Sequence, residues 1–166
     1  MTATITGDRL YDLRAAVRAE CGRTIHAALA VAGYEYTDAD LCPMSVEYAE
    51  ETLALHARDL AHTVDALPIA ARPDGWDTPT GDTHRPDTLS LAVRAVVRAA
   101  LDAAAHDFTA SRIDTPRGEA ARQHLALAAR LLAQVVDGLP PGCQPLGWGD
   151  TGDAAWWRHG RTLGRA

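Results

Sequence analysis

The sequence predicts an all-α protein: an antiparallel four-helix bundle made of two copies of one helical hairpin, with a short C-terminal helix added. Two observations indicate this fold. Residues 52–76 and 124–148 align without a gap, and 14 of the 25 positions are identical. Four segments also carry apolar side chains with the period of an α-helix, and helices with one apolar stripe each pack into a bundle. A repeat of this kind defines the architecture before any single element is considered.

The 166 residues are expected to form one domain, which is long enough to bury a substantial core. The two repeats are placed at about 8–76 and 87–148, and 149–166 is a C-terminal extension whose short helix is expected at 153–163. Hydrophobic residues make up 47% of the chain and charged residues 23%, so a globular protein is expected.

The first hairpin is predicted to contain helices at 8–32 and 45–67. Gly22 is a weak point inside the first helix, Ser45 is the candidate N-cap of the second, and Pro68 ends it. The predicted apolar stripes are Leu13, Val17, Cys21, Thr24 and Ala28, then Leu53, Leu60, Val64 and Leu67.

The second hairpin is predicted to contain helices at 87–111 and 115–138. Asp87 is the candidate N-cap of the first of these. Thr115 is the candidate cap of the second, with Pro116 at the first helical position, where proline is favoured. The predicted apolar stripes are Leu89, Val93, Val97, Ala100, Ala104 and Phe108, then Leu125, Leu132, Val136 and Leu139.

Charge and cysteine content exclude several classes of partner. The formal net charge of −6 opposes binding to phosphate backbones or anionic membranes, so neither nucleic acid nor membrane is expected as a partner. No run of 18 apolar residues is present, and residues 1–8 lack the features of a signal peptide. The three cysteines form neither a metal-binding spacing nor an even disulfide set, so a cytoplasmic location is expected.

One stretch carries a family resemblance. After an Ala/Leu/Arg-rich helix, residues 139–153 read LPPGCQPLGWGDTGD. Over about residues 115–153 the chain resembles a family of small Streptomyces proteins that have no assigned molecular function and are sometimes labelled natural-product biosynthesis proteins. The resemblance implies an actinobacterial host and a setting in specialised metabolism, and it supplies no catalytic residues to carry over. All 16 basic residues are Arg, which agrees with the GC-rich genome of such a host.

The four tryptophans are predicted to gather at one end of the bundle. In an up-down-up-down order, the tails that follow the second and fourth helices leave at that end. Aromatic walls beside carboxylates suit a small-molecule or cationic ligand. Alternatively the rings fill the open end of the core, which the repeated Gly-Trp favours. The residues assigned to ligand binding are Trp76, Trp148, Trp156, Trp157, Asp77 and Asp153, and the candidate acids and bases are His84, Asp82 and Asp150.

A second candidate patch lies on the helix at 45–67. His56, Asp59 and Thr63 flank its apolar stripe, whereas the equivalent positions of the other copy are apolar. This asymmetry indicates either a buried site in one copy or a face in contact with solvent.

The same helix also carries candidate metal ligands. His56 and Asp59, with Glu51 and with His106 or His124 from other helices, are the candidate ligands. The sequence lacks the Glu-x-x-His pairs of di-iron bundles and the HExxH motif of zinc proteases. No metal ligand and no cofactor are therefore assigned.

Two matched arginine pairs lie on the first helix of each copy, Arg14 with Arg18 and Arg94 with Arg98. Two neighbouring guanidinium groups can clamp a carboxylate or a phosphate. The alternative is that they form solvated ion pairs with neighbouring carboxylates.

Three functional hypotheses follow. The sequence has no Gly-x-Ser-x-Gly motif and no P-loop, so a non-catalytic module that binds a small molecule or a partner protein is the leading one. A homodimer is one form that a protein partner could take. The second is a small enzyme of natural-product biosynthesis with its site at the tryptophan-rich end. The third is a transcriptional regulator, which the acidic charge opposes.

Overall fold

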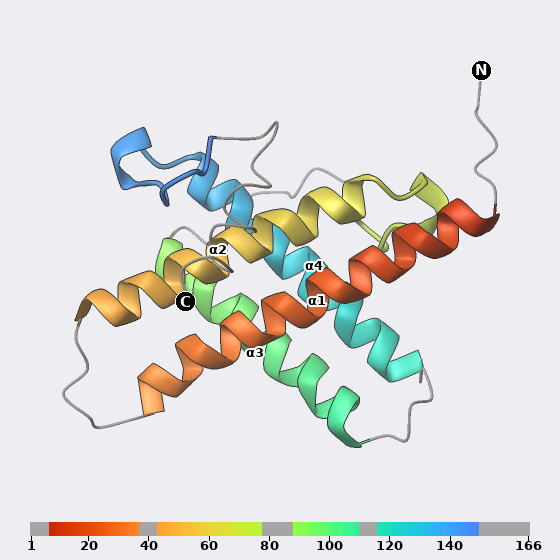
Figure 1. Ribbon diagram of the computed structural model, residues 1–166, viewed down its shortest axis with the longest axis horizontal. Helices are drawn as coiled ribbons and strands as arrows, with labels where there is room; N and C mark the ends of the chain where they lie inside the picture. Colours follow the sequence, from red (N-terminus) through yellow and green to blue (C-terminus); the bar gives the residue numbers. More distant parts are fainter. Residues whose placement is uncertain (1–6, 37–42, 78–87, 110–115, 150–166) are drawn as a thin grey trace, which may run out of the picture.

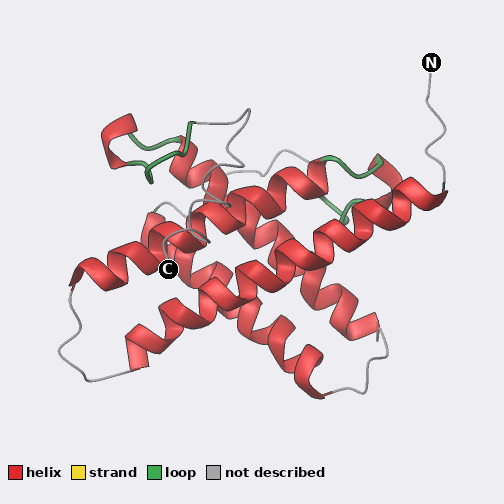
Figure 2. Ribbon diagram, viewed as in Figure 1, coloured by secondary structure: helices red, strands yellow, loops and turns green. Residues whose placement is uncertain are grey.

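The computed structural model describes residues 7–36, 43–77, 88–109 and 116–149 (Figure 1). All regular elements in these ranges are helical (Figure 2), which confirms the predicted all-α four-helix bundle. The expected helix at 153–163 lies outside the described residues, as do Thr115 and Phe108's side chain. None of the described helices is both long and apolar enough to cross a bilayer. The elements are α1 (Gly7–Tyr36), α2 (Pro43–Asp65), η1 (Ile69–Ala71), α3 (Leu89–Thr109), α4 (Pro116–Asp137) and η2 (Pro141–Cys143), where η denotes a 3-10 helix.

The helix ends lie within a few residues of the predicted ones, and two predicted caps change. α2 begins at Pro43, so Ser45 lies in its first turn and is not its N-cap. Thr88 caps α3, because the backbone N–H three residues later donates to Thr88 Oγ1 at 3.3 Å. The predicted cap Asp87 lies outside the described residues. Pro116 is the first residue of α4, as predicted.

The four helices form two hairpins that lie across each other. α1 packs along α2 and α3 along α4, and the hairpins meet mainly through α2 with α4 and α1 with α3. Figure 1 shows the α3–α4 hairpin crossing the α1–α2 hairpin. The tail after α2 leaves at one side of the molecule and the tail after α4 at the other (Figure 1). The predicted up-down-up-down order, with both tails at one end, is therefore wrong.

The predicted apolar stripes supply the core. The equivalent residues of α2 and α4 are fully buried: Leu53, Leu60 and Val64, and Leu125, Leu132 and Val136. Each such side chain contributes about 1.5–3 kcal/mol through its burial. Leu89, the first residue of α3, is the exception among the described stripe residues of that helix, since it is 36% exposed.

α1 is buried along only part of its length. Cys21, Thr24 and Ala28 lie in the core, whereas Leu13 and Val17 are only partly buried against it. The first turns of α1 therefore border solvent-accessible space between α2 and α4.

Candidate functional site

Each tail that follows a long helix ends in a tight turn that places a tryptophan. After η1, the backbone N–H of Trp76 donates to Pro73 O at 3.0 Å, and Gly75 has φ of 80°. A positive φ at the third position is what a type II turn requires, and glycine adopts it without a steric penalty. The second tail has the same turn 72 residues later, with Pro145, Gly147 (φ 81°) and Trp148.

Both indole rings are buried and hydrogen-bonded. Trp76 is 1% exposed and Trp148 is 5% exposed. Trp76 Nε1 donates to Asp65 Oδ1 at 2.7 Å, and Trp148 Nε1 donates to Asp137 Oδ1 at the same distance. Each indole N–H thus fixes its tail to the last turn of the helix that precedes it. The burial of both rings agrees with the alternative in which the tryptophans fill the core, which the repeated Gly-Trp favours.

Each ring also contacts an arginine of the other hairpin. The guanidinium of Arg58 in α2 lies 5.2 Å from the ring centroid of Trp148, and that of Arg130 in α4 lies 5.0 Å from that of Trp76. Both distances fit cation–π contacts. Arg58 Nη1 also donates to Gly147 O at 3.1 Å and to Trp148 O at 2.8 Å. The tails therefore join the two hairpins.

The residue before each turn caps the preceding helix. Arg72 Nε and Nη2 donate to the carbonyls of Leu67 and Asp65, and Arg72 Nη1 pairs with Asp77 Oδ1 at 2.7 Å. Gln144 Nε2 at the equivalent position donates to the carbonyls of Val136 and Asp137 at the end of α4. These donors satisfy helix C-terminal carbonyls that have no intrahelical partner. Asp77, assigned to ligand binding from the sequence, is held by Arg72.

The predicted tryptophan-rich end is thus divided. The two tails that carry Trp76 and Trp148 lie on opposite sides of the molecule (Figure 1), and each ring is buried in its own contacts. The other predicted residues of that end lie outside the described residues: Trp156, Trp157, Asp153, His84, Asp82 and Asp150.

The second predicted patch lies between α1 and α2. Asp59 is 7% exposed and His56 is half-buried, so the interpretation of this face as solvated is wrong for Asp59. Thr63 Oγ1 donates to Asp59 O at 2.7 Å within the same helix, which satisfies the hydroxyl locally.

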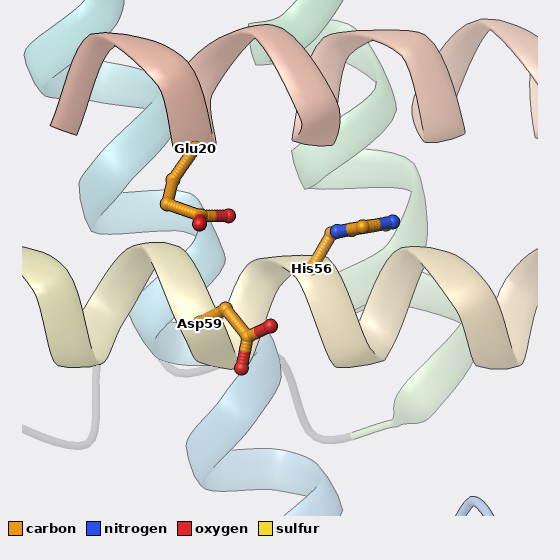
Figure 3. A group of neighbouring side chains, drawn as sticks. All are labelled: Glu20, His56 and Asp59. Atoms are coloured by element: carbon orange, nitrogen blue, oxygen red, sulfur yellow. The ribbon is translucent and has the colours of Figure 1, made fainter. Parts of the chain in front are cut away.

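Glu20 of α1 joins His56 and Asp59. One ligand-type atom from each of the three side chains lies within 4.8 Å of the others, with Glu20 extending from α1 toward α2 (Figure 3). Glu20 is 6% exposed and forms an ion pair with Arg23. Thr24 Oγ1 lies 2.8 Å from Glu20 O and 3.4 Å from His56 O, so it links the backbones beneath the cluster.

Glu20 was not among the residues predicted for this cluster. The available signal was helical spacing: Glu20 precedes Thr24, a member of the predicted inward stripe, by four residues, which places both on one face of α1. A charged residue with that spacing indicates a polar group inside the hairpin. Of the other metal-ligand candidates, Glu51 is half-buried on α2, His106 is on α3 and His124 is exposed on α4.

An arginine-lined pocket lies between the first turns of α1, the tail after α2 and the first turns of α4. It has a cavity volume of about 470 Å³. Its charged lining residues are four arginines and two acidic residues. They are Arg14, Arg18, Arg72, Arg122, Asp74 and Glu119. The matched pair Arg94 and Arg98 is exposed on α3 and does not line this pocket.

A smaller pocket of about 140 Å³ occupies the equivalent place in the other hairpin. Val64 and Pro73 line the arginine-lined pocket, and Val136 and Pro145, 72 residues later, line this one. Its charged residues are all acidic: Glu47, Glu50 and Glu51. Glu50 replaces the arginine found at 122, so the same place in the fold has opposite charge in the two copies.

Comparisons with protein-family models, curated proteins and solved structures give no match to the chain.

Proposed function

We propose that the chain is a non-catalytic binding module that holds a small anionic molecule, a carboxylate or phosphate compound, in the arginine-lined pocket. The observation that carries the proposal is that four arginines are among the residues lining one cavity of about 470 Å³. A cavity of a few hundred cubic ångströms is the usual size for small-molecule sites. Arginine is also the side chain best suited to recognise planar oxyanions.

The charge distribution supports an anion rather than a neutral ligand. The described residues that line the pocket include four arginines and only two acidic residues, so its lining is positive, although the whole chain carries a net charge of −6. A concentrated positive site on an acidic protein attracts anions to one place. The equivalent pocket of the other hairpin is acidic, so the shape that the fold provides does not by itself require arginines.

Two of the arginines are held in position by the protein. Arg72 is bonded to carbonyls at the end of α2 and to Asp77, and Arg122 is paired with Glu119 at 3.1 Å. A guanidinium has five N–H donors, so Arg72 retains donors for a ligand. Within the described ranges, no side chain forms an ion pair or hydrogen bond with Arg14. Preorganised charges lower the entropic cost of binding.

The setting in actinobacterial specialised metabolism remains part of the proposal, supported by the resemblance of residues 115–153. The proposal is tested by titrating the full chain calorimetrically with inorganic phosphate, citrate and short dicarboxylates. Neutral analogues and alkylammonium salts of similar size serve as controls. We expect at least one anion to bind with a stoichiometry of one and the controls to give no heat. Absence of binding by every anion at low ionic strength would contradict the proposed site.

A further inference from the structure

We propose that Glu20, His56 and Asp59 form a binding site for one divalent first-row transition-metal ion. Two carboxylates and one imidazole supply the ligand atoms, which lie within 4.8 Å of one another (Figure 3). An imidazole with carboxylates suits Zn²⁺ or Fe²⁺ better than the all-oxygen ions Mg²⁺ and Ca²⁺. The site is separate from the arginine-lined pocket, and neither proposal depends on the other.

The helices bring these ligands together from two directions. His56 and Asp59 are three residues apart on α2, so they lie on one face, and Glu20 approaches from α1 (Figure 3). Tetrahedral ligands about 2.1 Å from a zinc ion lie about 3.4 Å from one another. The ligand atoms therefore need to approach one another by at most about 1.4 Å, which small rotations of the three side chains can provide.

One buried oxygen in the cluster lacks a partner. Asp59 is 7% exposed, and its Oδ1 lies 3.4 Å from Arg58 Nη2, a long contact. Asp59 Oδ2 is buried and accepts no hydrogen bond from the described residues. Leaving a buried carboxylate oxygen unsatisfied is costly, and a bound cation would supply the missing interaction.

The neighbouring arginines compensate the charges of the two carboxylates only in part. Arg58 is already bonded to the carbonyls of Gly147 and Trp148, so it can compensate Asp59 only partly. The Arg23 side chain that pairs with Glu20 is 54% exposed, so it can turn to solvent when an ion takes its place. The two carboxylates then match the double charge of the ion.

The site is accessible from one side. His56 also lines a shallow surface groove with Arg23 and Thr52, and this groove gives an ion a route to the ligands. Three protein ligands leave a fourth coordination position for water.

The test is a titration of the full chain, first stripped of metal with a chelator. Co²⁺ is followed by its visible absorption and Zn²⁺ by competition with a chromophoric chelator. We expect one equivalent of each ion to bind, with Mg²⁺ much weaker. His56→Ala should weaken binding at least tenfold, whereas His62→Ala, at an exposed position of the same helix, should not change it.

A second variant keeps the test decisive if His56→Ala does not fold. Glu20→Gln preserves the size and shape of the side chain while removing its charge and replacing one acceptor oxygen with an NH2 donor, and it should also weaken Zn²⁺ binding at least tenfold. Zn²⁺ should raise the melting temperature of the wild-type chain and not that of Glu20→Gln. No saturable binding by the wild type, or wild-type affinity in a folded Glu20→Gln, would overturn the proposal.

Discussion

The guanidinium of Arg58 lies 5.2 Å from the ring centroid of Trp148 and donates hydrogen bonds to two carbonyls of the same tail. Arg130 has the reciprocal position over Trp76, at 5.0 Å. Each tail therefore bonds to its own hairpin through an indole N–H and contacts the other hairpin through an arginine. The two tails thus make matching contacts, and both are part of the interface between the hairpins.

The two arginines are not equivalent in energy, and this gives a first prediction. Arg58→Ala removes a cation–π contact, leaves two carbonyls without their charged donor and takes away the cation beside the buried Asp59, so we expect a loss of about 2–4 kcal/mol in the free energy of unfolding. Within the described residues, the cation–π contact with Trp76 is the only polar contact of Arg130, so Arg130→Ala is expected to lose about 1 kcal/mol in the free energy of unfolding. Urea denaturation followed by circular dichroism measures both. Equal losses would show that the carbonyl contacts of Arg58 contribute nothing.

The indole hydrogen bonds give a second prediction. Asp65→Ala and Asp137→Ala each remove a bond of 2.7 Å from a buried indole N–H to a carboxylate. We expect each to cost about 1–2 kcal/mol, and the two losses to add because the bonds lie in separate tails. Asp74→Ala, at an exposed position of the first tail, is the control and should stay within about 0.5 kcal/mol of the wild type. If Asp65→Ala were as stable as Asp74→Ala, the tail would not be fixed by its tryptophan.

The helices could be predicted from the sequence because their signals are local. The apolar stripe of α4 and the proline at its first position lie in consecutive turns, and the structure has them as expected. The repeated Gly-Trp likewise indicates that Trp76 and Trp148 have the same structural role, because the same backbone turn requires the same residues. These features need no knowledge of how the hairpins meet.

The packing of one hairpin on the other could not be predicted in this way. Whether α4 contacts α2 or lies diagonal to it depends on side-chain fit between residues far apart in the chain. No pattern of residue spacing along the sequence predicts that fit. The predicted common end of the tails failed for this reason. The cluster around Asp59 was found only in part, because Glu20 comes from a different helix and carries no motif with His56.

Two glycines give a third prediction, in which the same change to alanine lowers the free energy of unfolding at one position and raises it at the other. Gly75 has φ of 80°, which a residue with a Cβ adopts at a cost of about 1–2 kcal/mol, so Gly75→Ala should destabilise the protein by about that amount. Gly22 lies inside α1 with no other heavy atom within 4 Å of an added Cβ. Gly22→Ala should therefore raise the free energy of unfolding by about 0.5–1 kcal/mol. Thermal and urea denaturation report both. A stabilised Gly75→Ala chain would contradict the turn geometry.

The arginine-lined pocket gives the last prediction, and the second copy of the hairpin supplies its control. Arg14→Gln with Arg18→Gln removes two of the four guanidinium groups, and we expect at least a tenfold loss of affinity for the anion that the titrations identify. Arg94→Gln with Arg98→Gln makes the same change in charge at the matching positions of α3, outside the pocket, and should leave affinity within about twofold, since distant surface charges are screened. Both pairs are exposed, so stability should change by less than about 0.5 kcal/mol for each residue replaced. Affinities are measured by calorimetry at one fixed ionic strength. Equal weakening by the two double variants would mean that net charge, and not the pocket, attracts the anion.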